Sequence, residues 1–154
     1  MYDTIVYVAG PYRAPSEHQL IENIRAAETV AKALWKAGFV ALCPHMNTAH
    51  FGGIVDDEAF VKGSLELLSR CDAVIFLPKW KESRGSVQEY DYAAKHSTPR
   101  FFMRSELGLE CIIDQIIKWR FGNGLGTIKS DASIHRRNEC AVRDDDRADS
   151  EPEK

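Results

Sequence analysis

One stretch decides the fold: Ile5-Val6-Tyr7-Val8-Ala9-Gly10-Pro11. It is a short apolar run closed by a Gly-Pro turn, which predicts a buried strand. Two similar runs follow, Phe39-Val40-Ala41-Leu42-Cys43 before Pro44 and Asp72-Ala73-Val74-Ile75-Phe76-Leu77 before Pro78. All three are continuously apolar rather than alternating, and this pattern is typical of parallel strands that are covered on both faces.

Helical patterns separate these strands. Apolar residues recur at helical spacing over residues 16–37, and Gly38 stands where a helix stop is expected. The other predicted elements are helices over residues 60–68, 86–96 and 107–121, a loop over residues 45–57 and a fourth strand over residues 100–103. This alternation predicts a doubly wound α/β fold of the Rossmann or flavodoxin type, with a parallel sheet of four to five strands and helices on both faces.

The predicted domain covers residues 1–121. Residues 122–154 contain three glycines and few apolar side chains, so they cannot bury enough apolar surface to become ordered. We expect a flexible, disordered and charged tail there.

Composition limits the classes of partner. A net charge of −3 over 154 residues gives no basic field, so we expect no long nucleic acid as a partner. No apolar run approaches the roughly 20 residues of a membrane-spanning helix, and the first residues lack the pattern of a signal peptide. We therefore expect a cytoplasmic protein that binds a small molecule and has no membrane partner.

Polar residues after the third strand are the strongest candidates for a site, because ligands of such sheets bind beyond the carboxyl ends of the strands. Ser83, Gly85 and Ser86 precede or open a predicted helix, whose free N–H groups and dipole would attract a phosphate. The loop is neither GxGxxG nor GxxxxGK[ST]. Alternatively, Ser83 or Ser86 simply caps the helix and Glu89 is an exposed carboxylate, and spacing alone leaves both interpretations open.

Three motifs in order resemble those of the nucleoside 2-deoxyribosyltransferase superfamily. They are Tyr7-Val8-Ala9-Gly10-Pro11, Cys71-Asp72-Ala73-Val74, and Ser83-x-Gly85-x-x-x-Glu89 followed by Tyr90 and Ala93. In motif the chain looks most similar to the nucleoside 5′-monophosphate N-glycosidases and their uncharacterised phage and bacterial relatives. The resemblance spans about residues 4–104, and it implies a homodimer or larger assembly. We expect no cofactor.

The resemblance also implies catalytic roles. Glu89 would be the nucleophile on the sugar C1′, and Tyr7 would lie against it and orient it. The chemistry suits these residue types, since a carboxylate can stabilise or trap the oxocarbenium-like state of N-glycosidic cleavage. Attack by water would then give hydrolysis, whereas attack by a second base would give transfer.

One position indicates the substrate. Relatives that act on free nucleosides carry an aspartate six residues before the nucleophile, whereas the monophosphate N-glycosidases carry serine, and this chain has Ser83. An aspartate would repel a 5′-phosphate, but a hydroxyl accepts it. We therefore expect a nucleoside 5′-monophosphate. The expected phosphate-binding residues are Gly10, Arg13, Ser83, Gly85 and Ser86, with Arg84 as a further counterion.

The chain departs from the pattern at the acid. In much of the superfamily an aspartate eight residues before the strand-entry aspartate helps to protonate the departing base, and here that position is Ser64. We hypothesise that a residue after the second strand replaces it. The candidates are His45, His50, Asp56 and Asp57.

Other candidates have simpler interpretations. Cys43, His45 and His50 lack the compact ligand spacing of zinc sites, so we expect no metal. Trp80 either stacks on a base or covers the sheet edge. Asp72 is expected to fix backbone N–H groups at the start of a strand.

The predicted activity is hydrolysis of the N-glycosidic bond of a (deoxy)nucleoside 5′-monophosphate. The enzymatic alternative is a nucleoside 2-deoxyribosyltransferase. Because Ser64 replaces the usual acid, the alternative that is not an enzyme is a non-catalytic nucleotide-binding sensor.

Overall fold

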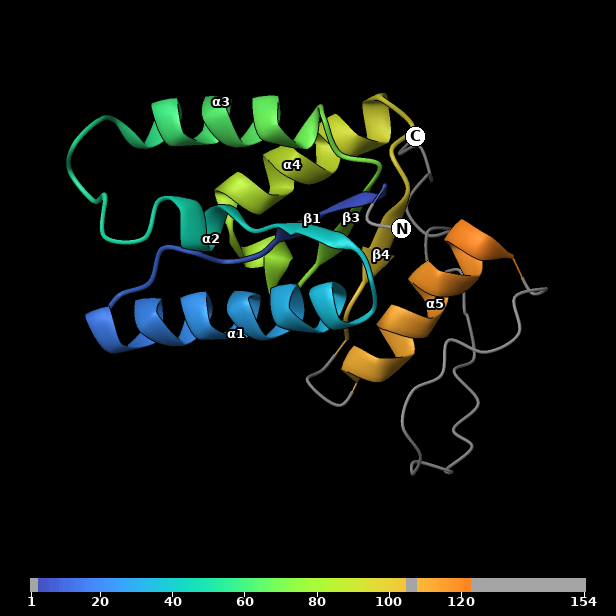
Figure 1. Cartoon of the computed structure of the whole chain (residues 1–154). Coiled ribbons are helices and arrows are strands. Elements are labelled where there is room, and N and C mark those ends of the chain that lie inside the picture. Colours follow the sequence, from blue (N-terminus) through green and yellow to red (C-terminus); the bar gives the residue numbers. More distant parts are fainter. Residues whose placement is uncertain (1–2, 105–107, 123–154) are drawn as a thin grey trace, which may run out of the picture. The chain divides into compact units, whose positions relative to one another are not determined.

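The computed structural model describes residues 3–104 and 108–122, which belong to one compact unit. Strands and helices alternate along the chain, as the sequence predicts (Figure 1). The elements are β1 (Ile5–Ala9), α1 (Glu17–Lys36), β2 (Val40–Leu42), α2 (Pro44–Asn47), α3 (Asp57–Leu68), β3 (Ala73–Phe76), the 3₁₀ turn η1 (Trp80–Glu82), α4 (Arg84–Lys95), β4 (Arg100–Phe102) and α5 (Leu109–Phe121).

The four strands form a parallel sheet in the order β2-β1-β3-β4. After β1 the chain moves to one side of that strand to form β2, then crosses to the other side to form β3 and β4. The order therefore reverses between β1 and β3. In doubly wound sheets such a switch point opens a crevice at the carboxyl ends of the strands, where ligands bind.

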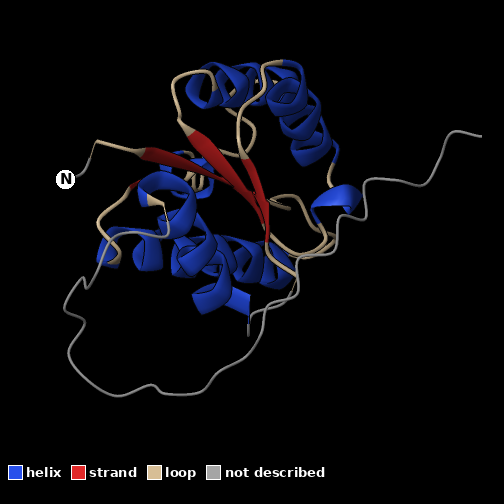
Figure 2. Cartoon of the chain, turned by 90° about the vertical axis from the view of Figure 1, so that its right-hand side faces the viewer, coloured by secondary structure: helices blue, strands red, loops and turns tan. Residues whose placement is uncertain are grey.

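The side chains of β1 alternate between two hydrophobic clusters. Val6 and Val8 pack in the cluster that includes residues of α1 and α5, whereas Tyr7 and Ala9 pack in the cluster that includes Leu68 of α3 and Ala93 of α4. Helices consequently cover both faces of the sheet (Figure 2). Because strand side chains alternate, Tyr7 must point into the layer that carries α4.

Helix α1 begins at a serine cap and ends before the predicted glycine stop. The Ser16 hydroxyl accepts a hydrogen bond from the Gln19 N–H at 3.2 Å, which satisfies one of the free donors of the first turn. The helix ends at Lys36, and Gly38 adopts a φ of 86° before β2. That left-handed conformation is accessible to glycine without strain.

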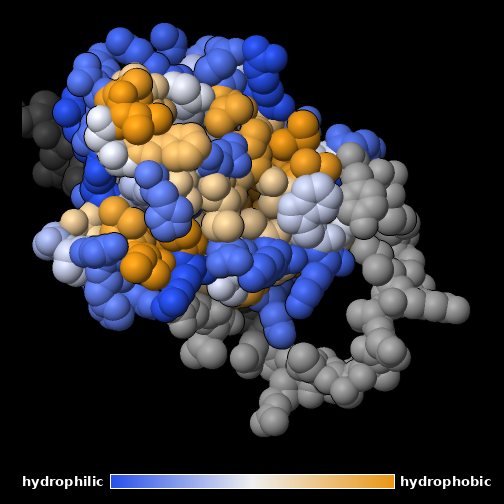
Figure 3. Space-filling view, turned by 60° about the vertical axis from the view of Figure 1, so that its left-hand side comes forward, coloured by the Kyte–Doolittle hydropathy of each residue, from blue (hydrophilic) through white to orange (hydrophobic). Residues whose placement is uncertain are grey.

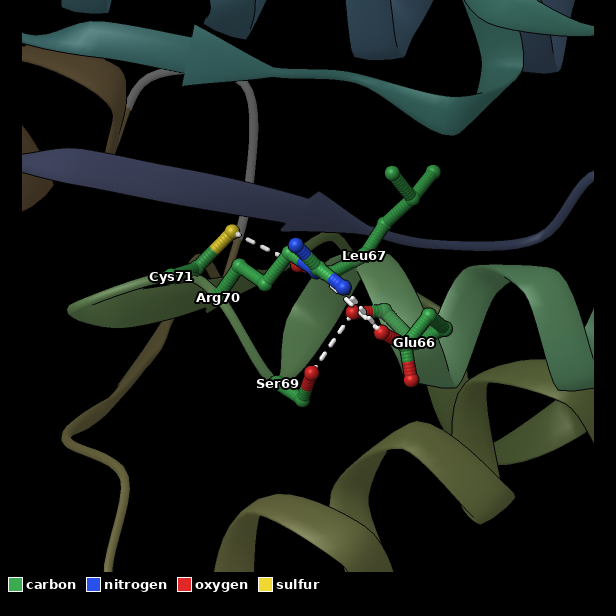
Figure 4. Close-up of polar contacts among 5 residues, drawn as sticks. All are labelled: Glu66, Leu67, Ser69, Arg70 and Cys71. Atoms are coloured by element: carbon green, nitrogen blue, oxygen red, sulfur yellow. Dashed lines mark hydrogen bonds and ion pairs between the residues drawn. The ribbon is translucent and has the colours of Figure 1, made fainter.

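A group of polar contacts ends α3 and leads into β3 (Figure 4). Arg70 forms an ion pair with Glu66 at 2.6 Å, and the Ser69 hydroxyl donates to the Glu66 carbonyl at 2.7 Å. The Cys71 thiol donates to the carbonyl of Leu67 at 3.3 Å. The serine and cysteine contacts satisfy carbonyl groups of the last turn of α3, just before the buried strand.

Asp72 has the structural role that the sequence predicts. Its Oδ2 accepts a hydrogen bond from the Ile5 N–H at 2.7 Å, and its own N–H donates to the Ile5 carbonyl at 2.9 Å. The side chain thus ties the start of β3 to the start of β1.

Two short helical elements correct the sequence predictions. Residues 45–57 were expected to be loop, but α2 forms there because Pro44 suits a first helical position and the Cys43 carbonyl accepts the N–H groups of Met46 and Asn47. The turn η1 also lies in a segment with no predicted helix. Helix α4 begins two residues before its predicted start, since Ser83 rather than a later residue is the N-cap.

The expected charged tail, residues 122–154, lies outside the described residues apart from Gly122. Within residues 3–104 and 108–122, no helix combines the length and the apolar character needed to cross a bilayer.

Candidate functional site

A cavity of about 760 Å³ lies at the carboxyl ends of β1, β2 and β3. This volume is in the usual range of small-molecule sites. Most of the predicted site residues line it, together with one face of α3. The lining residues that bear on chemistry are Gly10, Arg13, His45, Asp57, Glu58, Lys62, Ser64, Lys79, Glu82, Ser83, Arg84, Gly85, Ser86 and Glu89.

Tyr7 and Glu89 meet in the buried part of the site. The Tyr7 hydroxyl donates to Oε1 of Glu89 at 2.5 Å, although the two residues are 82 positions apart in sequence. Tyr7 is fully buried and Glu89 is only 8% exposed. The alternative in which Glu89 is an exposed helix carboxylate is therefore wrong. The contact arises because Tyr7 faces the layer that α4 occupies.

Burial controls the protonation of this pair. It raises the pKa of Glu89 from 4.5 to about 7, and the hydrogen bond from Tyr7 offsets only part of that effect. Burial, followed by the nearby Glu89 carboxylate, raises the pKa of Tyr7 well above 10. Tyr7 consequently remains a hydrogen-bond donor at neutral pH, while Glu89 titrates in the physiological range.

The N-terminus of α4 forms the next wall of the cavity. Ser83 is its N-cap, and the Ser83 hydroxyl accepts from the Ser86 N–H at 3.4 Å. The N–H groups of Arg84 and Gly85 have no acceptor within the helix, because the first turn lacks preceding carbonyls. The Ser86 hydroxyl oxygen is buried and has no hydrogen-bond partner. This helix end thus offers several donors on one side of the cavity.

Gly10 allows a close approach directly after β1. A Cβ atom at this position would lie 2.7 Å from Cδ1 and 2.9 Å from Cβ of Leu77. The backbone can therefore pass this close to Leu77 only because residue 10 has no side chain.

His45 lies under that turn. Its Nε2 is 3.1 Å from the carbonyl oxygens of both Gly10 and Pro11. Carbonyl oxygens only accept, so Nε2 carries the proton and Nδ1 does not. Nδ1 is buried without a partner, and burial lowers the pKa of His45. The ring is therefore neutral at physiological pH.

Charged side chains of both signs surround the cavity mouth. Arg13 forms an ion pair with Asp57, and Lys62 forms one with Glu58 at 3.1 Å. All four side chains are exposed, so these pairs contribute little to stability and can rearrange around a ligand. Arg84 is also exposed.

Three predicted residues lie elsewhere. His50 and Asp56 are exposed in the segment before α3, and neither lines the cavity. The Trp80 ring stacks on Tyr90 at 4.8 Å between ring centroids and packs on Phe76 at 4.9 Å. Trp80 also packs on Phe102 of the edge strand β4 at 5.8 Å between ring centroids, and it is not among the residues that line the cavity.

The segment between α2 and α3 is apolar as well as exposed. Phe51, Ile54 and Val55 are each at least 45% exposed, and Phe51 lines the cavity. Figure 3 shows the face to which this segment belongs, with apolar patches set among hydrophilic side chains.

Sequence interpretation did not assign the face of α3 that lines the cavity. Glu58, Val61, Lys62 and Leu65 recur at intervals of three and four residues, so they share one side of the helix. That spacing is visible in the sequence. The sequence does not show that this face lines the cavity, because that depends on how α3 packs over the sheet.

Ser64 also lies in the site. It lines the cavity, and hydrogen bonding from its hydroxyl acts to lower the pKa of Tyr7. Among the described residues, no group of three or more His, Cys, Asp or Glu side chains could hold a metal ion.

Residues 4–99 match a family described as a domain of unknown function, DUF4406. The chain belongs to this family. Glu89, Tyr7 and the N-terminus of α4 all lie within the DUF4406 region. A comparison of the sequence with curated proteins found no match.

The fold of this DUF4406 chain is similar to that of a solved 2-deoxyribosyltransferase from the psychrotolerant bacterium Bacillus psychrosaccharolyticus. The TM-score is 0.51 and the sequence identity is 14%, over 71% of this chain and 82% of the other. At this identity the likeness establishes a shared fold.

Proposed function

We propose that this protein hydrolyses the N-glycosidic bond of a (deoxy)nucleoside 5′-monophosphate, with Glu89 as the nucleophile on C1′. The observation that carries the proposal is the buried Glu89 carboxylate, held by the Tyr7 hydroxyl at 2.5 Å beside a cavity of about 760 Å³. A carboxylate without a counterion in an apolar setting is costly to maintain, so its retention favours a chemical role.

The reaction needs Glu89 in its ionised form. With a pKa of about 7, roughly half of the molecules carry the carboxylate at neutral pH. Tyr7 orients the attacking oxygen by its hydrogen bond and cannot remove the proton, because its own pKa is well above 10. Attack on C1′ would form a glycosyl ester, which water then hydrolyses.

The 5′-phosphate would bind at the N-terminus of α4. Ser83, Gly85 and Ser86 offer hydroxyl and N–H donors there, and the positive end of the helix dipole adds to the attraction. Glu89 lies five residues after Arg84, about 7.5 Å further along the axis at the usual rise of an α-helix. That spacing is comparable with the reach from the phosphate to C1′ of one nucleotide.

Arg13 would supply a further counterion at the cavity mouth. It is paired with Asp57, so a phosphate would have to share or displace that carboxylate. Gly10, directly after β1, lines the cavity and would lie beside the ligand.

The test is a chromatographic screen for free base, using canonical and modified NMPs and dNMPs with and without an acceptor base. Base release without acceptor, abolished in Glu89→Gln, is the expected result. Reaction only when acceptor is added would identify a 2-deoxyribosyltransferase instead. A nucleotide that raises the melting temperature without any base release would identify a sensor.

Two further expectations remain proposals. We propose that the protein is a homo-oligomer in which a neighbouring chain helps to close each site, and that it acts in the cytoplasm. Sedimentation of the purified protein at several concentrations tests the first.

A further inference from the structure

The way in which the base departs limits which nucleotides can react, and this inference rests on the proposed N-glycosidase function. A neutral base leaves C1′ as an anion unless an acid protonates it. General acid help of this kind is typically worth about 10²- to 10⁴-fold in rate. The proton donors that line the cavity therefore decide which bases are competent leaving groups.

The carboxyl groups at the cavity mouth are poor donors. Glu58 is paired with Lys62, whose hydrogen bond and charge lower the pKa of that carboxyl. Asp57 is paired with Arg13. Glu82 is exposed on the turn η1. A carboxylate that is held by a cation accepts hydrogen bonds and has no proton of its own to donate.

His45 is also unsuited to donate. Its single proton, on Nε2, is directed at the carbonyl oxygens of Gly10 and Pro11, both at 3.1 Å. Nδ1, the other ring nitrogen, is buried and unprotonated. Burial lowers the pKa of the ring, which opposes the imidazolium form that could protonate a base.

Ammonium and hydroxyl groups complete the set of donors that line the cavity. Lys62 is paired with Glu58, Lys79 is exposed, and Tyr12 is a phenol. An ammonium group, with a usual pKa of about 10.4, is a far weaker acid than a carboxylic acid. Ser64 stands where a carboxylic acid would be expected, and Tyr7 already donates its proton to Glu89. Alcohols and phenols are far weaker acids than carboxylic acids. Apart from Glu89, which acts as the nucleophile, none of the described lining residues is therefore placed and poised to protonate a departing base.

We propose that the preferred substrate is a nucleotide whose base is positively charged before the bond breaks, such as an N7-alkylated purine nucleotide or a pyridinium nucleotide. Such a base needs no proton, because it leaves as a neutral molecule. A site that has serine rather than a carboxylic acid at position 64 can cleave such a substrate, because no general acid is needed.

The state of Glu89 favours the same class of substrate. Its pKa is about 7, so part of the population is protonated and inactive at neutral pH. A cationic base bound within a few ångströms stabilises the carboxylate and shifts that population toward the nucleophile. A neutral base gives no such stabilisation. The substrate charge thus activates the residue that attacks it.

The reaction balances without a cofactor. The Glu89 carboxylate forms a C1′–O bond while the C1′–N bond breaks, and the bonding pair neutralises the charge on the ring nitrogen. Water then attacks the glycosyl ester at C1′, which restores the Glu89 carboxylate and releases a sugar phosphate and one proton.

The experiment compares 7-methylguanosine 5′-monophosphate with GMP, each as ribo and 2′-deoxy nucleotide, and adds nicotinamide mononucleotide. Free base is measured by chromatography and corrected for spontaneous release. We expect kcat/KM for the methylated substrate to exceed that for GMP by about 10³-fold or more, and Glu89→Gln to remove the activity on both.

Ser64→Asp supplies the missing acid and tests the cause. This variant should reduce the ratio of kcat/KM for the methylated substrate to kcat/KM for GMP by about 10²-fold, since general acid help benefits only the neutral base. The melting temperature of Ser64→Asp reports whether the variant folds. The comparison of the two substrates in the wild type does not depend on this variant. Wild-type kcat/KM values within tenfold of each other would overturn the substrate inference and keep the glycosidase. No base release from any nucleotide would overturn the glycosidase itself.

Discussion

Replacing Glu89 by glutamine should stabilise the folded protein above neutral pH while it removes activity. Glutamine has nearly the same shape and its amide oxygen can still accept from Tyr7, but it carries no charge into the buried site. The wild-type carboxyl has a pKa of about 7 when folded and 4.5 when solvated. The variant therefore isolates the free-energy cost of ionising a buried carboxyl group.

The pH dependence has a defined sign. Below pH 4.5 the carboxyl is protonated in both the folded and the unfolded state, so it contributes no difference. Between pH 4.5 and about 7 the unfolded state loses the proton first, and rising pH favours unfolding. Above about pH 7 both states are ionised, and the full penalty of roughly 3 kcal/mol is constant.

Thermal melts of wild type and Glu89→Gln between pH 5 and 8 measure this penalty. The variant should gain little at pH 5 and roughly 6–12 °C in Tm at pH 8. The matched control is Glu82→Gln, which neutralises an exposed carboxylate of the same cavity and should follow the wild-type curve. Parallel curves for wild type and Glu89→Gln over the whole range would contradict a raised pKa at Glu89.

Three further predictions concern activity and packing. In the wild type, kcat/KM for base release should rise with pH to a plateau above about pH 7, because the free enzyme must ionise Glu89; a profile that falls through pH 7 would contradict the nucleophile. Tyr7→Phe removes the hydrogen bond that lowers the pKa of Glu89, so the midpoint of that profile should move to higher pH and not merely drop in height. Gly10→Ala should lower the free energy of unfolding by about 1–3 kcal/mol, because the added methyl group would clash with Leu77. The control Gly63→Ala lies in the exposed middle of α3 with open space around it, so it should raise the free energy of unfolding by about 0.5–1 kcal/mol. Equal denaturant midpoints for the two variants would contradict the close approach at Gly10.

The order of elements could be predicted from local patterns. The apolar run of β1 and the Gly38 stop after α1 are encoded within a few residues of sequence, and the structure has them at the expected positions. The resemblance in sequence also named Glu89 and Tyr7 as a pair. Their contact follows from the alternation of β1 once α4 is known to cover that face.

Features that depend on packing between distant segments were not predictable. The raised pKa of Glu89 requires the enclosure formed by α3, α4 and β1, and no local pattern reports it. The tautomer of His45 follows from the turn after β1, which lies 35 residues earlier in the chain. Helix α2 was missed because four residues give too short a pattern to show periodicity.

The most direct measurement of the central claim is mass spectrometry of the protein after acid quench during turnover of a nucleotide. The proposed mechanism predicts a sugar phosphate ester on the peptide that contains Glu89, and none in Glu89→Gln. A sugar phosphate attached to a different residue would contradict nucleophilic attack by Glu89. A rapid initial release of base while the protein carries no sugar phosphate would contradict it as well.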